Sequence, residues 1–138
     1  MLWTKAADGS VTGALDAKSP GWAAFGFPGE RGSMLGGAVV IVTPDPGARG
    51  LASARTATLA GYSPNTFVSP SPDLQTDGPL TAGIPATGRI AATFKFTSVP
   101  AGGKVMMATG PMVGAPGGGA GKMAIHLPGR AAVADLVF

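Results

Sequence analysis

The chain has 138 residues, of which 45% are hydrophobic and 12% are charged, a balance that suits one folded domain with a single core. The formal charge is +3 and the Lys and Arg residues are scattered, so the sequence does not predict nucleic-acid binding. The absence of cysteine excludes disulfides, iron–sulfur clusters, zinc–thiolate sites and covalent CxxCH haem attachment. The apolar runs are too short for a transmembrane helix, so we do not expect this chain to insert into a membrane.

Strand signals begin near the N-terminus. Residues 2–6 (LWTKA) and 10–17 (SVTGALDA) flank the turn sequence ADG, which predicts a β-hairpin. Residues 21–27 (GWAAFGF) and 37–43 (GAVVIVT) form two more predicted strands, and a loop separates them. Gly or Pro interrupts almost every window that a helix would need.

The rest of the chain continues in the same way. Predicted strands lie at 53–62 and 74–84, with a Pro- and Ser-rich stretch between them, and then at 89–97, 104–112 and 131–138. The strand at 89–97 alternates clearly, with Ile90, Ala92, Phe94 and Phe96 on one face. About nine or more short strands with turn signals between them predict an all-β protein, an antiparallel β-sandwich.

The domain organisation is expected to be simple. No internal repeat and no second domain are visible, so we assign residues 1–138 to a single domain. The chain ends on ADLVF without a polar tail, which would fit a domain excised from a longer protein.

Two common kinds of site are not supported by the motifs. The glycine-rich stretch before Lys122 is not a phosphate-binding P-loop, because Pro116 stands where a glycine is needed and Met123 where Ser or Thr is needed. Hydrolytic catalysis is disfavoured because there is no G-x-S-x-G motif and the carboxylates mostly lie in turn sequences.

One pair of residues indicates a different chemistry. Met34 lies in a Gly- and Ser-rich loop, and His126, the only histidine, precedes the last strand. Alone, Met34 could be a packing residue and His126 a surface or core histidine. Together, a thioether and an imidazole are a suitable axial pair for haem iron, and Met/His ligation favours electron transfer.

At these residues the sequence resembles the DOMON family, specifically its cytochrome branch, which includes the haem domain of cellobiose dehydrogenase and domains that precede cytochrome b561 membrane modules. The resemblance rests on the tryptophan strand LW, the hairpin, GWAAFGF, a Met-containing loop, GGAVVIV, and then ATGPM, a loop, a His and AAVADLVF. Residues 3–42 form its more specific part. It departs from the family in having no cysteines, because many members carry disulfides.

The resemblance implies an immunoglobulin-like β-sandwich that holds one non-covalent haem b between Met34 and His126. Apolar walls are expected from Trp22, Phe25, Phe27, Leu35, Met112 and Met123. Candidates for contact with the haem propionates are Tyr62, Lys122 and Arg130.

The functional expectation that follows is an extracytoplasmic electron-transfer domain, secreted or at the cell surface, which does no bond chemistry itself. Its redox partner would be a flavin dehydrogenase, a cytochrome b561 membrane module or an oxidase. Two alternatives stay open: a carbohydrate-binding DOMON sandwich without haem, and an adhesion module without any ligand. Sugar sites need aromatic platforms, and only 7% of the residues are aromatic, which disfavours the first alternative.

Overall fold

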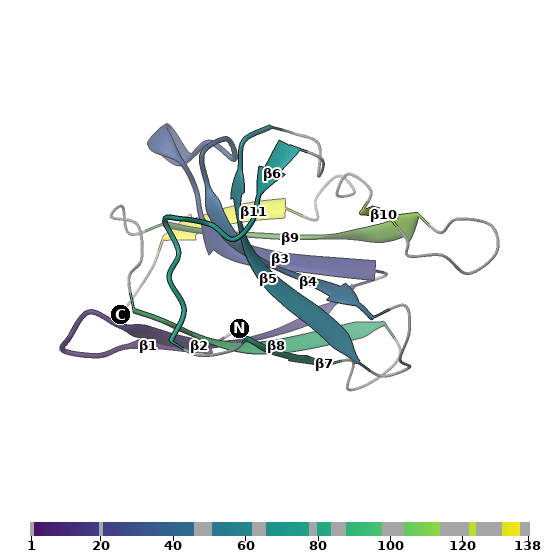
Figure 1. Ribbon diagram of the computed structural model, residues 1–138, viewed down its shortest axis with the longest axis horizontal. Helices are drawn as coiled ribbons and strands as arrows, with labels where there is room; N and C mark the ends of the chain where they lie inside the picture. The colour runs from purple at the N-terminus through teal and green to yellow at the C-terminus, as the bar shows by residue number, and fades with distance from the viewer. Residues whose placement is uncertain are drawn as a thin grey trace.

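The fold is a sandwich of two antiparallel sheets, as the spacing of the strand signals predicted (Figure 1). The computed structural model describes residues 2–19, 21–45, 51–61, 66–77, 80–83, 88–97, 104–113, 122–123 and 131–135. Within these residues the secondary structure consists of eleven strands and one 3₁₀ turn, Glu30–Gly32. No helix in the described part of the chain has the length and apolar character needed to cross a bilayer.

The smaller sheet has four strands in the order β1-β2-β8-β7. Their bounds are β1 Leu2–Lys5, β2 Val11–Lys18, β8 Arg89–Phe96 and β7 Thr81–Gly83. Strands β2 and β8 pair along their whole length, from Val11 opposite Phe96 to Lys18 opposite Arg89. Within the predicted strand at 74–84, the structure has only the short strand β7.

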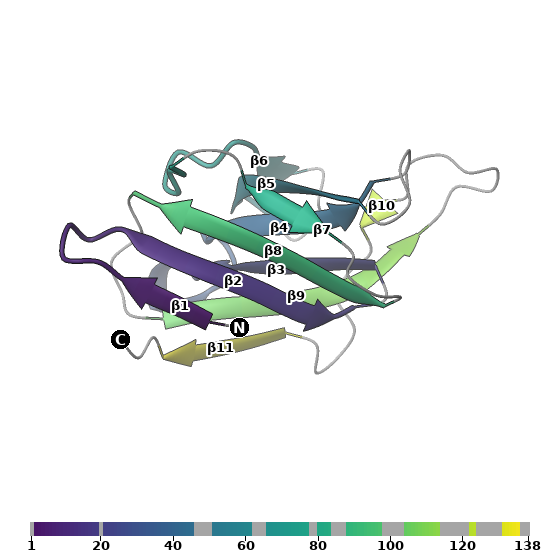
Figure 2. The same ribbon diagram turned by 90° about the horizontal axis from the view of Figure 1, so that it is seen from below.

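The larger sheet has seven strands in the order β10-β9-β3-β4-β5-β6, and β11 also pairs with β9 (Figure 2). Their bounds are β3 Gly21–Phe27, β4 Ala38–Pro44, β5 Ala52–Leu59, β6 Phe67–Val68, β9 Lys104–Val113, β10 Lys122–Met123 and β11 Ala131–Asp135. Strand β3 lies at the centre, between β9 and β4.

The β1–β2 hairpin forms because its turn residues suit a tight reversal. Gly9 has a φ of 86°, which a glycine adopts without steric cost. The Asp8 carboxylate accepts a hydrogen bond of 2.9 Å from the Ser10 N–H, and the Ala6 N–H donates to the Ser10 carbonyl at 2.8 Å. The predicted ADG turn is thereby confirmed.

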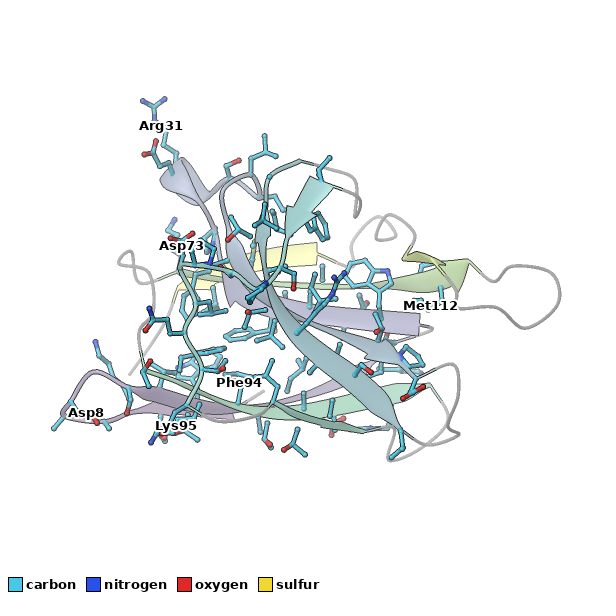
Figure 3. The ribbon with its side chains drawn as sticks, viewed as in Figure 1. Asp8, Arg31, Asp73, Phe94, Lys95 and Met112 are labelled. Carbon is cyan, nitrogen blue, oxygen red and sulfur yellow. The ribbon has the colours of Figure 1, made fainter. Side chains whose placement is uncertain are left out.

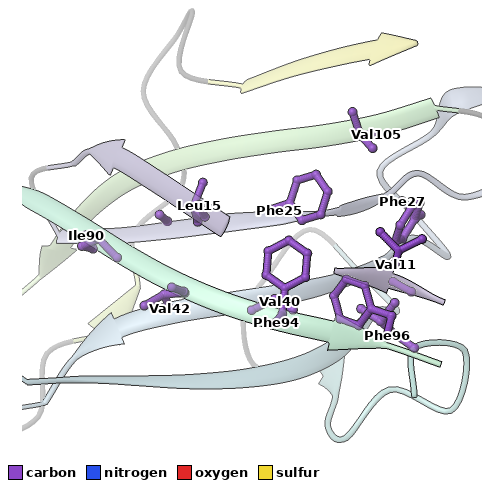
Figure 4. Packing of buried hydrophobic residues seen from close by; sticks show 14 residues of the cluster. Val11, Leu15, Phe25, Phe27, Val40, Val42, Ile90, Phe94, Phe96 and Val105 are labelled. Carbon is purple, nitrogen blue, oxygen red and sulfur yellow. The ribbon is translucent and has the colours of Figure 1, made fainter. Parts of the chain in front are cut away.

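The main core lies between the two sheets and is built around stacked aromatic rings (Figure 4). Phe25 of β3 stacks on Phe94 of β8 at a centroid distance of 5.2 Å, and Phe94 stacks on Phe96 at 4.7 Å. Phe27 meets Phe25 and Phe96 edge to face. These ring geometries add to the apolar area that the sandwich buries and fix how the sheets face each other.

The described ion pairs lie with the smaller sheet, away from this core. Arg89 pairs with Asp16 across β8 and β2, and Lys95 of β8 pairs with Asp77. All four side chains are about half exposed, so each pair contributes little to stability.

Candidate functional site

The two faces of β3 separate the aromatic residues that the sequence had grouped together. Successive side chains on a strand point to opposite faces of the sheet. Phe25 and Phe27 point into the core between the sheets, where 1% and 3% of their surface stays exposed. Trp22 and Ala24 are two positions apart and therefore share the other face of β3. Ala24 packs against a second apolar cluster on that face, and Trp22 is also buried. Phe25 and Phe27 therefore belong to the sandwich core, on the other side of the sheet from Met34.

That opposite face is apolar and buried as well, which is unusual for an antiparallel sheet, where one face commonly meets water. We call this second cluster the outer apolar face. It consists of the buried residues Val39, Ile41, Ala57, Leu59 and Met106, against which Ala24, Met34 and Phe67 pack. Because five consecutive residues of β4 are buried, both faces of the larger sheet must be covered.

Met34 reaches the outer apolar face from the loop between β3 and β4. The loop begins with the 3₁₀ turn Glu30–Gly32 and returns to the sheet at Gly37, whose N–H donates to the Met34 carbonyl at 3.1 Å. The Met34 side chain packs against the cluster but stays half-buried, whereas 7% of Met106 is exposed. Met34 thus places a partly exposed thioether at the rim of the outer apolar face.

Gly37 allows the loop to lie close to the sheet. A Cβ at this position would stand 2.5 Å from the Met106 Cε, 2.9 Å from the Phe27 carbonyl oxygen and 3.0 Å from the Met34 carbonyl oxygen. Such distances exclude any larger residue without a shift of its neighbours. The sequence analysis did not single out Met106 or Gly37. The unbroken apolar run in β4 was the signal that this side of the sheet is also covered.

Trp22 lies farther along the same sheet, at the pair that it forms with Gly110 of β9. A Cβ on Gly110 would come within 2.5 Å of the indole Nε1, so the ring occupies the space above this glycine. Met112, two residues farther along β9, is half-buried (Figure 3). Trp22 and Met112, two of the expected wall residues, therefore lie on neighbouring strands, at the end of β9 that pairs with β10.

The second predicted ligand, His126, lies outside the described residues, as do Tyr62 and Arg130. Of the other expected contacts, Lys122 and Met123 form β10 and pair through their backbones with Val113 and Met112. Leu35, next to Met34, is 37% exposed. The structure thus describes one of the two predicted ligands.

The strands on either side of His126 are described, and both pair with β9. Met123 of β10 lies opposite Met112, and Ala131 of β11 lies opposite Ala108. Strands β10 and β11, which precede and follow His126 in the sequence, thus both pair with β9, and β3 pairs with its other edge.

The pKa shifts concern side chains on the smaller sheet and in its β1–β2 turn. The hydrogen bond to Asp77 raises the pKa of Lys95, and that to Asp16 raises the pKa of Arg89. Hydrogen bonds from Ser10 lower the pKa of Asp8. The residues of the outer apolar face are uncharged, which is the environment that a neutral, water-excluded redox centre requires.

The described residues can be compared with what a metal ion or a haem would need. Among them, no group of three or more His, Cys, Asp or Glu side chains could hold an ion. In haem, the four porphyrin nitrogens already bind the iron, so the protein needs to supply only two further donors and apolar surroundings. The Met34 thioether and the outer apolar face supply one donor and such surroundings.

Comparisons with known proteins do not identify a family: a scan against protein-family models, a search of curated proteins and a search of solved structures each give no match. The resemblance to the DOMON family, and the haem site that it implies, therefore stay predictions.

Proposed function

We propose that the chain is an electron-transfer domain that binds one haem b non-covalently, with Met34 and His126 as axial ligands. It is not itself an enzyme in this proposal. Single electrons would pass to or from a redox partner such as a flavin dehydrogenase, a cytochrome b561 membrane module or an oxidase, on the extracytoplasmic side of a membrane.

The observation that supports this proposal is the outer apolar face with the Met34 thioether at its rim. Purely structural sandwiches do not need a second buried cluster on the far side of one sheet. Because the chain already buries the residues of this face, the cofactor would lie against its rim, beside the half-buried Met34 side chain.

The choice of His126 rests on the resemblance, because this residue lies outside the described part of the chain. Met123 is fixed opposite Met112, and three residues of chain span at most about 11 Å, so the imidazole is tethered near this end of β9. Trp22 lies two β9 residues from the same point. Met34 lies at the opposite end of the β3–β9 pair, beside Met106, so the chain after Met123 would have to reach back along β9 to bring both ligands to one iron.

When bound, haem supplies a one-electron ferric–ferrous couple. The Met34 sulfur is a soft donor that favours ferrous iron and so raises the reduction potential. The outer apolar face excludes water and disfavours net charge, with the same effect on the potential. Two protein ligands leave no open iron position for a substrate, which is why we propose electron transfer rather than oxygen chemistry.

A carbohydrate site receives no comparable support. Sugar-binding proteins offer exposed aromatic rings as platforms, and every aromatic side chain that the structure describes is buried or half-buried. Trp22 is 6% exposed, and Phe25, Phe27, Phe94 and Phe96 stack on one another in the core.

The test is a visible spectrum of the purified chain after incubation with hemin, recorded oxidised and reduced. We expect a low-spin spectrum with sharp reduced bands, lost in Met34→Ala and in His126→Ala. Met106→Leu is the matched control, because it removes a second thioether from the same face and should leave the low-spin form intact. A chain that stays colourless would overturn the proposal, and unchanged spectra in both ligand variants would overturn the ligand assignment.

A further inference from the structure

We propose that Ser33 is a positioning residue for the Met34 thioether: its hydroxyl fixes the backbone on which this ligand stands. The inference rests on the proposed function and deepens it. The Ser33 Oγ accepts a hydrogen bond of 3.1 Å from the N–H of Leu35, two residues on. A bond between a serine hydroxyl and the N–H two residues later closes a small turn around the residue between them. Here the residue between them is Met34.

The backbone on both sides of Met34 is held in the same way. The Gly29 N–H donates to the Ser33 carbonyl at 2.8 Å, and the Ser33 N–H donates to the Glu30 carbonyl at 3.1 Å. After Met34, its own carbonyl accepts from the Gly37 N–H. With the Ser33 hydroxyl included, the peptide groups before and after Met34 each have a fixed partner.

This hydrogen-bonded loop is itself attached to the sheet. The Gly36 N–H donates to the Leu59 carbonyl at 2.9 Å, and the Leu59 N–H donates to the Gly37 carbonyl at 2.8 Å. Leu59 belongs to the outer apolar face, so these bonds attach the loop directly to that face.

The loop also contains a backbone conformation that its sequence does not favour. Arg31 has φ 57° and ψ 21°, in the left-handed region where side chains other than glycine are strained. Strained residues persist where the surrounding structure holds them, often near functional sites. Here the strained turn reverses the chain so that Ser33 and Met34 come back over the sheet.

The physical reason that such positioning matters is the flexibility of methionine. Its side chain has three rotatable bonds, and each degree of freedom that is lost on ligation weakens the iron–sulfur bond. A backbone that was also free at Met34 would add to that loss, and the hydrogen bonds around Met34 remove this added cost before the ligand binds. Ser33 therefore acts through Met34 and does not contact the cofactor itself in this proposal.

The first experiment uses the haem-free chain labelled with ¹³C at the methionine methyl groups, with the Met34 signal assigned through Met34→Leu. We expect Ser33→Ala to sharpen the Met34 methyl signal and move it toward the position of an unstructured methionine. Ser33→Thr keeps the hydroxyl and should restore the wild-type signal. Ser71→Ala is the comparison for the loss of a serine hydroxyl outside the loop: Ser71 accepts from the Asp73 N–H at 3.2 Å and is also bonded to the Thr58 hydroxyl at 2.7 Å.

The second experiment uses the hemin-loaded chain and titrates added imidazole, which competes with the thioether for iron. The concentration that displaces half of the Met34 ligation should fall about fivefold in Ser33→Ala, as expected for the loss of one hydrogen bond of typical net worth. Ser33→Thr and Ser71→Ala should titrate as the wild type does.

The outcomes separate the two proposals. A Met34 methyl signal that Ser33→Ala leaves unchanged, or an unchanged imidazole titration, would overturn the role of Ser33 even if haem binds. If the wild-type chain binds no haem, the proposed function fails, and the methyl signal alone still decides whether Ser33 holds Met34 in place.

Discussion

Met34 and Met106 show how two identical side chains on one face can have different roles. Met106 starts from β9 and is 7% exposed, so its sulfur is enclosed by the packing. Met34 starts from a loop and is half-buried, so its sulfur can face a bound group while its stem stays on the apolar surface. We therefore assign the ligand role to Met34 and a packing role to Met106.

Met34→His should keep the haem six-coordinate but lower its reduction potential. An imidazole is a harder donor than a thioether and stabilises ferric iron relative to ferrous. The shift should be a sizeable part of the range of about 0.8 V over which axial ligands set haem potentials. It can be measured by spectroelectrochemical titration. Met106→Leu should leave the potential close to that of the wild type, and an unchanged potential in Met34→His would argue against Met34 as a ligand.

At the scale of elements, β3 and β4 set the architecture because both of their faces are buried. Their sequences GWAAFGF and AVVIV lack the polar alternation of a strand with one wet face. The pairing of β3 with β4 is also tight. A Cβ on Gly26 would meet the Val39 Cα at 2.5 Å and the Ala38 carbonyl oxygen closer still.

Gly26→Ala should therefore destabilise the fold, by about 1–3 kcal/mol in the free energy of unfolding, because the added methyl group forces the two backbones apart. Urea denaturation followed by tryptophan fluorescence measures the change. Gly83→Ala in β7 is the control, since a Cβ there meets nothing within 4 Å, and it should shift the free energy by no more than about 0.5 kcal/mol. Equal effects of the two substitutions would contradict this account of the β3–β4 contact.

The β1–β2 hairpin should give the fold an acid-sensitive element. Hydrogen bonds from Ser10 lower the pKa of Asp8 in the folded chain below its ordinary value of 3.8. A lowered folded-state pKa means that the contribution is present above pH 3.8 and is lost as the pH falls through the folded value. Asp8→Asn should make the unfolding free energy less dependent on pH in this acid window, and parallel curves for the two chains would contradict the assignment.

Several elements could be predicted from sequence because their signals are local. The hairpin followed from its ADG turn, and the alternation of Ile90, Ala92, Phe94 and Phe96 predicted the buried face of β8, which is confirmed. The 3₁₀ turn before Met34 could not be predicted in the same way. It contains Arg31, a left-handed residue other than glycine, and the loop that follows it is attached through Gly36 and Gly37 to Leu59, far along the chain.

At the scale of the whole molecule, the chain builds two apolar clusters where a simple sandwich needs one. The first lies between the sheets and holds the aromatic stack. The second is the outer apolar face, to which the β3–β4 loop contributes Met34 and the edge strand β6 contributes Phe67. Both clusters bury apolar surface and so stabilise the fold, and the proposed function concerns the second.

Sequence reasoning reached this division only in part. It grouped Phe25 with Trp22 as walls of one site, because both lie in the strand before the Met34 loop. Their spacing of three residues puts them on opposite faces of β3, which strand periodicity could have indicated once the strand was assigned. Which segments cover each face could not be read from the strands, because coverage depends on loops that are close in space and distant in the chain.

Hemin binding should stabilise the whole fold, because a group bound to the folded chain alone shifts the unfolding equilibrium. At a free hemin concentration of 100 times the dissociation constant, the gain is about 2.7 kcal/mol, or roughly 10 °C in the melting temperature. Scanning calorimetry with and without hemin measures it. The double variant Met34→Ala, His126→Ala should show a clearly smaller gain, and an equal gain would place the binding surface elsewhere.

The most direct test of the central proposal is X-ray absorption at the iron edge of the hemin-loaded chain. It reports the elements bound to iron without reference to any spectrum of a known cytochrome. We expect one sulfur neighbour in the first coordination shell of the wild-type chain and none in Met34→Ala. A first shell of nitrogen and oxygen alone in the wild-type chain would contradict the account.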